Sequence, residues 1–258
     1  MIAVWITFIF LLGLTVGSFL NVVIYRLPLD QSVVRPGSHC PHCKHPIRPW
    51  HNIPLLSYML LRGKCADCKK PMSIRYPMVE LLTGILFVTT AFRFGVQPIL
   101  FIHDLPFVAA LIAITFIDLE HRIIPDELSL GVLVLGLATS WVIPELGLVQ
   151  SLLGAAVGFG IFYGFAWLYE WRTGRSGMGG GDIKLLAALG AYLGPQGVLV
   201  TILISSISGS LIGVLWAVLN KEKRLLGAAI PYGPFLVIGG LYSYWIGDIS
   251  WLPFMKLM

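Results

Sequence analysis

The chain has 258 residues, of which 57% are hydrophobic and 12% are charged, with a net charge of +5. This share of charge is about half that of an ordinary soluble domain, and the mean hydropathy is +0.82. The composition therefore excludes an ordinary soluble domain. Several apolar stretches reach the roughly 20 residues that a transmembrane helix needs. They do not alternate polar and apolar residues, as the strands of a membrane barrel would. We therefore expect an all-α polytopic membrane protein.

About eight transmembrane helices are predicted. The segments are 2–24, 77–94, 99–117, 128–143, 149–169, 183–193, 197–219 and 231–247. The first segment is not expected to be a cleaved signal peptide, because no basic residue precedes it and no small-residue cleavage site follows it. Segment 183–193 is too short to span a membrane alone, and the Gly194-Pro195 pair breaks the helix after it.

A polar loop, residues 26–76, separates the first helix, 1–25, from a membrane core, 77–258. It contains two similar stretches, "CPHCKHPI" and "CADCKKPM". Two Cys-x-x-Cys knuckles predict a structural zinc site with four thiolate ligands, and the metal would supply folding energy to this small domain. The predicted ligands are Cys40, Cys43, Cys65 and Cys68. Two disulfides, or mixed ligation with nearby histidines, are the alternatives; those histidines are His39, His42, His45 and His51.

The basic residues gather on one side of the predicted membrane. Loop 26–76 holds nine of the 18 Lys and Arg residues, and alternation of the helices places seven more on the same side. These seven are Arg122, Arg172, Arg175, Lys184, Lys221, Lys223 and Arg224. Because cytoplasmic loops are enriched in Lys and Arg, we expect a cytoplasmic cysteine loop. The positive net charge then requires no nucleic-acid partner.

Three acidic residues, Glu80, Asp118 and Asp182, lie at the predicted cytoplasmic ends of apolar segments. Ionisable groups at the membrane are candidates for function. Asp118 and Asp182, if brought together, would share a proton. One would act as a base and the other as an acid on water and a peptide carbonyl. The alternatives are a helix N-cap for Asp182 and a polar loop boundary for Asp118.

Two other classes of function fit parts of the pattern. An ion- or proton-coupled transporter would use Asp118, Asp182 and Glu80, since transporters have broken helices near their sites. Those sites lie near the midplane, however, whereas these residues are predicted at the membrane edge. A zinc-stabilised membrane assembly factor without catalytic activity would leave the two aspartates unexplained.

Six motifs in this order resemble the type IV prepilin peptidases, which are membrane aspartic peptidases with a Gly-x-Gly-Asp motif. They are "GSFLNVVIYRLP" (17–28), the double Cys-x-x-Cys loop, "RYPMVELLTG" (75–84), "DLEHRIIPD" (118–126), "GMGGGDIKLL" (177–186) and "IPYGPFL" (230–236). The resemblance implies that Asp118 and Asp182 are catalytic. It implies that Gly179, Gly180 and Gly181 support Asp182, and we expect their conformational freedom to place that carboxyl group.

The resemblance also implies substrates, a cofactor and a location. Members of this family remove a short basic leader from type IV prepilins or pseudopilins, of pilus or type II secretion systems, at the cytoplasmic face. Members with the cysteine loop also methylate the new N-terminal amine with S-adenosylmethionine, so both activities are expected here. The expected location is the bacterial inner membrane, and no residues are assigned to the methyl donor.

Overall fold

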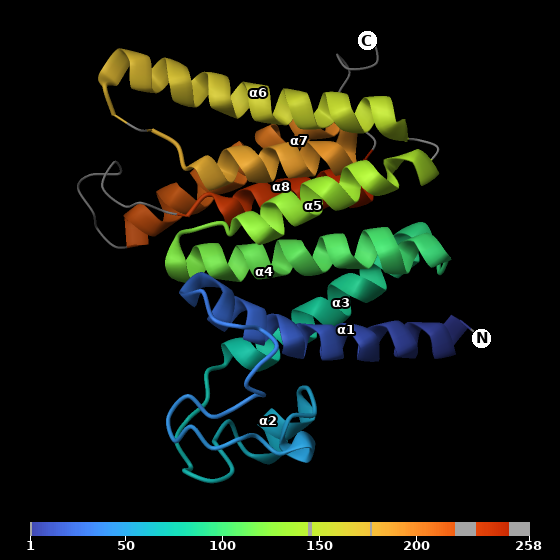
Figure 1. Ribbon diagram of the computed structural model, residues 1–258, viewed down its shortest axis with the longest axis vertical. Coiled ribbons are helices and arrows are strands. Elements are labelled where there is room, and N and C mark those ends of the chain that lie inside the picture. The colour runs from blue at the N-terminus through green and yellow to red at the C-terminus, as the bar shows by residue number, and fades with distance from the viewer. Residues whose placement is uncertain (1, 144–145, 176, 220–230, 248–258) are drawn as a thin grey trace. The chain divides into compact units, whose positions relative to one another are not determined.

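The computed structural model describes residues 2–143, 146–175, 177–219 and 231–247, and within these ranges it contains helices and no named strand. The α-helices are α1 (Ile2–Arg26), α2 (Leu56–Leu60), α3 (Arg75–Phe94), α4 (Leu105–His121), α5 (Asp126–Thr139), α6 (Gly147–Thr173), α7 (Gly180–Leu219) and α8 (Gly233–Ile246) (Figure 1). Short helical turns are η1 (Leu27–Leu29), η2 (Pro49–His51), η3 (Leu100–Asp104) and η4 (Ser140–Val142). Lys221, Lys223 and Arg224 of the charge argument lie outside the described residues. The all-α prediction is confirmed for the described chain.

Five of the described helices are long and apolar enough to cross a membrane. They are Ile2–Leu29, Arg75–Phe94, Leu100–His121, Gly147–Thr173 and Gly180–Leu219. Helix α6 exposes large apolar side chains such as Leu152, Phe165 and Trp171, which is typical of a surface that faces lipid. The prediction of a helical membrane protein is therefore confirmed. Helices α5 and α8 have 14 residues each.

The predicted break after segment 183–193 is confirmed. Helix α7 is interrupted at Gly194, whose φ of 68° and ψ of 178° are not helical, directly before Pro195. Glycine adopts a positive φ without the steric cost that a Cβ would bring. Proline cannot donate a backbone hydrogen bond to continue a helix. The two residues together therefore divide α7 into two parts.

The chain forms two compact units, Met1–Ala113 and Ile114–Met258, with the boundary inside α4. In the first unit, α1 packs closely on α3. A Cβ on Gly13 would lie 2.7 Å from Cα of Gly84, and a Cβ on Gly17 would lie 2.7 Å from Cα of Glu80. Small residues allow helix backbones to approach in membranes. The contact thus fixes the position of Glu80 beside α1.

In the second unit, α7 packs against α5, α6 and α8 (Figure 1). Gly154 of α6 faces Gly190 of α7 so closely that a Cβ on either residue would overlap the carbonyl oxygen of the other. A Cβ on Gly240 of α8 would lie 2.7 Å from the Leu189 side chain. These contacts hold the first part of α7, which begins just before Asp182, between its neighbours.

Candidate active site and metal-binding cluster

Asp118 lies in the last turn of α4 and is only 5% exposed. The backbone N–H of Gly233 donates a hydrogen bond of 2.9 Å to its Oδ2 atom. Gly233 is the first residue of α8, where backbone N–H groups have no partner within the helix. A Cβ at position 233 would lie 2.6 Å from the same oxygen, so glycine leaves the space that this hydrogen bond needs.

Asp182 lies in the first turn of α7, which begins at Gly180. Its backbone N–H donates to the carbonyl oxygen of Gly179 at 3.1 Å. An N-cap residue would precede the helix, whereas Asp182 is its third residue. The alternative of an N-cap is therefore not what the structure shows.

The structure brings Asp118 and Asp182 together. Their carboxyl groups are close enough to interact electrostatically. Ile124, in the connection between α4 and α5, lies against the start of α7 at Gly181 and the start of α8 at Gly233. A Cβ on Gly181 would be 2.9 Å from Cβ of Ile124, and a Cβ on Gly233 would be 3.3 Å from its Cδ1. The carboxyl groups of Asp118 and Asp182 and the apolar side chain of Ile124 thus lie together in the second unit.

Close contacts explain two of the three glycines before Asp182. A Cβ on Gly179 would lie 3.1 Å from the Asp182 carboxyl oxygen, and one on Gly181 would press on Ile124, while one on Gly180 would meet nothing within 4 Å. None of the three has a positive φ. We expected conformational freedom to explain these glycines. The structure instead indicates that lack of space for a side chain requires glycine at positions 179 and 181.

An ion pair ties the start of α5 to α7 near this site. The Lys184 ammonium group donates to both carboxyl oxygens of Asp126 at 2.7 Å. Lys184 follows Asp182 by two residues. The side chains of Lys184 and Asp126 are 39% and 55% exposed, so this ion pair contributes modestly to stability.

The two cysteine knuckles have the same backbone geometry. The Cys40 N–H donates to the His45 carbonyl at 3.0 Å, and the Cys65 N–H donates to the Lys70 carbonyl at 2.9 Å. Lys44 and Lys69 occupy equivalent left-handed positions with φ of 59° and 58°. The sequence repeat is thus also a structural repeat.

The four cysteines form a cluster that is able to bind a metal. The sulfur atoms of Cys40, Cys43, Cys65 and Cys68 all lie within 4.8 Å of one another, and no disulfide links them. Cys40 and Cys68 are 3.9 Å apart. Tetrahedral ligation with Zn–S bonds of about 2.3 Å separates ligand sulfurs by roughly 3.8 Å. The spacing of Cys40 and Cys68 is close to that value, so the cluster suits a four-thiolate metal site, and the disulfide alternative is not what the structure shows.

The two thiols of the first knuckle differ in acidity. Burial disfavours the charged form of Cys40, but hydrogen bonds from the Cys43 and His42 amides and from neighbouring thiols lower its pKa to about 7. The pKa of Cys43 is raised to about 11: a backbone hydrogen bond at His45 lowers it, but burial and the adjacent thiols raise it by more. One thiolate of the cluster is thus readily formed near neutral pH.

The nearby histidines do not join this cluster within the described residues. Nδ1 of His45 lies 3.1 Å from the Asp67 carboxyl group, and Nδ1 of His39 lies 3.1 Å from the Gly37 carbonyl. The third predicted acidic residue, Glu80, lies in the first unit. It is 7% exposed and accepts a 2.8 Å hydrogen bond from the Leu55 N–H.

Sequence reasoning missed Gly233 and Ile124 as parts of the aspartate site. Gly233 acts through a backbone amide, which carries no side-chain signal, although it lies in "IPYGPFL". Ile124 lies in "DLEHRIIPD" as one apolar residue among several.

Comparison with known proteins gives a consistent result over nearly the whole chain. Residues 11–94 match the model of the bacterial peptidase A24 N-terminal domain, and residues 105–214 match that of the type IV leader peptidase family. No solved structure gives a significant match.

Three similar relatives are each named prepilin leader peptidase/N-methyltransferase. The relative from Stutzerimonas stutzeri is 41% identical, over 95% of this chain and 93% of its own. That from Neisseria gonorrhoeae is 40% identical, over 93% and 90%. That from Pseudomonas putida is 38% identical, over 99% and 96%. Because the family models match residues 11–94 and 105–214 and these relatives are 38–41% identical over nearly the whole chain, the chain belongs to the type IV leader peptidase family.

Proposed function

We propose that the protein cleaves the basic leader from type IV prepilins or pseudopilins and then methylates the new N-terminal amine. The observation that carries the peptidase activity is the common position of Asp118 and Asp182. The name shared by the relatives, prepilin leader peptidase/N-methyltransferase, supports both activities. Membership of this family gives no support to a transporter that uses Asp118, Asp182 and Glu80.

In the proposed peptidase reaction the two carboxyl groups share one proton. Oδ2 of Asp118 accepts the hydrogen bond of the Gly233 amide, and the shared proton lies on either Asp118 or Asp182. The ionised group takes a proton from water, whose oxygen attacks the scissile carbonyl carbon, while the protonated group donates to the carbonyl oxygen. The C–N bond then breaks as the leaving nitrogen takes a proton from the dyad, which releases the leader with a new carboxyl group and the pilin with a new amine.

The proposed cofactors are a structural zinc ion and S-adenosylmethionine. Cys40, Cys43, Cys65 and Cys68 would hold the zinc, which is supported by the spacing of their sulfur atoms. S-adenosylmethionine would supply the methyl group from its sulfonium: the unprotonated amine would form an N–CH3 bond as the S–CH3 bond breaks, leaving a neutral thioether and releasing one proton from the nitrogen. The acceptor amine is formed only by the cleavage step, so methylation follows proteolysis.

The proposed arrangement is a multi-pass protein of the bacterial inner membrane. The eight predicted segments fall on α1, α3, α4, α5, α6, the two parts of α7, and α8; five of the described helices qualify as spans by length and composition, and we propose the other crossings. Residues 1–25, 26–76 and 77–258 would be the first span, a cytoplasmic zinc domain and the peptidase core. The gathering of 16 of the 18 Lys and Arg residues on one side supports a cytoplasmic loop and active site.

Thiol labelling tests this orientation. The Cys43 side chain is exposed, so after metal chelation it should react with a membrane-impermeant reagent in inverted vesicles. It should not react in intact cells whose outer membrane has been opened. Labelling in those cells instead would place the loop outside.

The function is tested with purified protein, a prepilin and S-adenosylmethionine, followed by mass spectrometry. The prepilin should lose its leader first and gain one methyl group afterwards. Asp118→Asn and Asp182→Asn should each abolish cleavage, because Asn cannot exchange protons at working pH, and the double variant should be no worse than either. Asp126→Asn is the matched control outside the dyad. Substantial cleavage by the Asp182→Asn protein would disprove the proposed dyad.

A further inference from the structure

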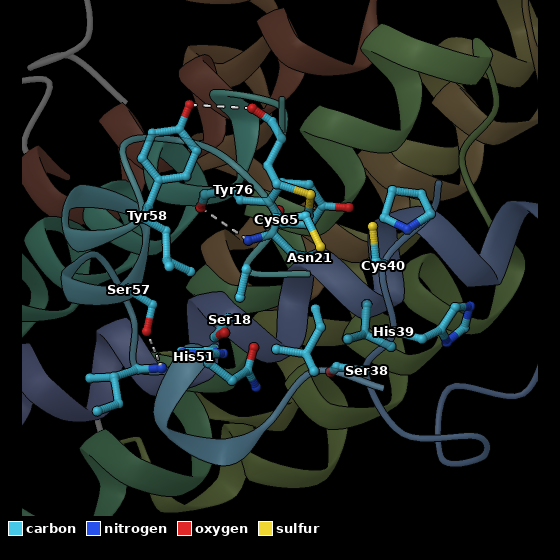
Figure 2. Close-up of a pocket in the computed structure, with 18 of the residues that line it drawn as sticks. Ser18, Asn21, Ser38, His39, Cys40, His51, Ser57, Tyr58, Cys65 and Tyr76 are labelled. Atoms are coloured by element: carbon cyan, nitrogen blue, oxygen red, sulfur yellow. Dashed lines mark hydrogen bonds between the residues drawn. The ribbon is translucent and has the colours of Figure 1, made fainter. Parts of the chain in front are cut away.

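A cavity in the first unit is lined by α1, α3 and the cysteine loop. Its volume is about 160 Å³, roughly ten times what one water molecule requires. Figure 2 shows Asn21, Tyr58 and Tyr76 around it, with Cys40 and Cys65 of the metal-binding cluster in its wall. Neither catalytic aspartate contributes to its lining.

Asn21, one of the lining residues, has an unpartnered acceptor atom. The residue is 3% exposed, and its Nδ2 group donates to the carbonyl oxygens of Gly17 at 3.2 Å and Tyr76 at 3.1 Å. These two carbonyls fix the orientation of the amide, since a flipped amide would place its oxygen against theirs. Its Oδ1 atom is buried and has no partner in the described part of the chain. Buried polar atoms normally have partners, so this oxygen suggests a ligand.

Glu80 contributes a buried carboxyl group to the same cavity. Its Oε2 atom accepts from the Leu55 N–H at 2.8 Å, and the Ser18 side chain is a second hydrogen-bond partner of the carboxyl group. No cationic side chain among the described residues forms an ion pair with it. Leu55 itself has a positive φ of 58°, which is strained for a non-glycine residue. Because a buried charge is costly unless it is paired, this wall suits a positively charged ligand.

The remaining lining adds aromatic surface. Tyr25, Tyr58 and Tyr76 are among the lining residues, and tyrosine rings bind flat heterocycles by stacking and cations by their faces. The other charged residues of the lining are Arg26, Lys64 and Asp67, and two of these are engaged. The Arg26 guanidinium donates to the carbonyls of Ser32, Pro36 and Gly37 at 2.7 to 3.1 Å, and Asp67 lies beside His45.

We propose that this cavity binds the methyl donor, S-adenosylmethionine, with the Glu80 carboxylate and Asn21 Oδ1 holding its positively charged methionine part and the tyrosines holding its adenosine. The proposal rests on the proposed methyltransferase function, to which it adds a site. A ligand with a cationic centre, N–H donors and an aromatic ring matches the carboxylate, the unpartnered acceptor and the rings described above. The cavity wall formed by Cys40 and Cys65 would link metal binding to methylation.

Calorimetric binding to the full-length protein in detergent tests the site with two probes, S-adenosylmethionine and adenosine. Glu80→Gln retains an oxygen that can accept from Leu55 but removes the charge. The affinity for S-adenosylmethionine should fall at least about tenfold, which is the expected effect of losing a charge-assisted contact. The affinity for adenosine should stay nearly unchanged. Asn21→Leu should act in the same direction. Asp30→Asn, an exposed charge removal in the same unit, is the control and should bind both probes as the wild type does.

The outcomes separate the site from the function. Equal weakening of both probes by Glu80→Gln and Asn21→Leu would indicate a distorted loop and would overturn the assigned roles. Unchanged affinity in both variants, with methylation intact in the wild type, would place the donor elsewhere while the proposed function stands. A wild-type protein that cleaves prepilin but neither binds the donor nor methylates would disprove the methyltransferase function and this site with it. Cleavage of prepilin should be the same in all of these variants.

Discussion

Two buried carboxyl groups in this protein, those of Asp118 and Glu80, are held alike but have different surroundings. Each is less than a tenth exposed, and each accepts one hydrogen bond from a backbone amide, at 2.9 Å from Gly233 and 2.8 Å from Leu55. Asp118 interacts with a second acidic group, Asp182. Glu80 instead lines a cavity. The difference indicates two kinds of chemistry, since paired acids share and transfer a proton, whereas a buried carboxylate beside a cavity is stabilised by a cationic ligand that pairs with it.

At the aspartate site, the largest effect on cleavage is expected from Gly233→Ala. The new Cβ would lie 2.6 Å from Oδ2 of Asp118, so either the carboxyl group or the start of α8 must move. A displacement of a reacting group by about 1 Å costs on the order of 100-fold in rate. Prepilin cleavage should fall by about that factor, while methylation of an already cleaved pilin should persist. Gly131→Ala, where a Cβ would meet nothing within 4 Å, is the control.

The cysteine cluster should show the opposite pattern. Replacing Cys43 and Cys68 with serine removes two thiolate ligands and should release about one zinc ion per chain, measured by atomic emission. Methylation of leaderless pilin should fall much further than prepilin cleavage, because Cys40 and Cys65 line the cavity of Glu80. An unchanged metal content would disprove the zinc site. Equal loss of both activities would show that the loop also serves the peptidase.

A smaller effect is expected from alanine at the glycines before Asp182. Gly181→Ala places a Cβ 2.9 Å from Ile124, and Gly179→Ala places one 3.1 Å from the Asp182 carboxyl group. Each should reduce the cleavage rate by about tenfold, since these shifts are smaller than a full ångström. Gly180→Ala should cost less than either, because no neighbour is within reach. If Gly180→Ala is the worst of the three, conformational freedom, not space, is why the run is glycine.

The smallest effect should come from the ion pair between Lys184 and Asp126. Exposed pairs contribute up to about 1 kcal/mol, which corresponds to at most about fivefold in kcat/KM. Lys184→Met should therefore slow cleavage by no more than that. A loss as large as that of Asp182→Asn would mean that Lys184 takes part in the reaction itself.

Local patterns in the sequence predicted their parts of the molecule well. The repeated Cys-x-x-Cys knuckle carries its turn residues with it, so the four sulfur atoms were expected together, and the structure gathers them. The Gly194-Pro195 break in α7 follows in the same way from two adjacent residues. Asp118 and Asp182 were expected as a pair because each adjoins an apolar run at the same predicted membrane face.

Contacts between distant segments could not be predicted in this way. Gly233 is 115 residues from Asp118, and its contribution is an amide hydrogen and a missing side chain. Asn21 lies within the apolar segment 2–24, where it gave only the general signal of a polar group in a membrane helix. The partner that sets its orientation, the Tyr76 carbonyl, is 55 residues away. The cavity depends on the packing of α1 on α3, which no single motif encodes.

The most direct test of the account gives the Asp182→Asn protein a mixture of prepilin and leaderless pilin with S-adenosylmethionine, and follows both by mass spectrometry. The account predicts that the prepilin keeps its leader while the leaderless pilin gains one methyl group at close to the wild-type rate. Cleavage of the prepilin would contradict the role of the dyad. Loss of methylation in a protein that still binds the donor would contradict the separation of the two sites.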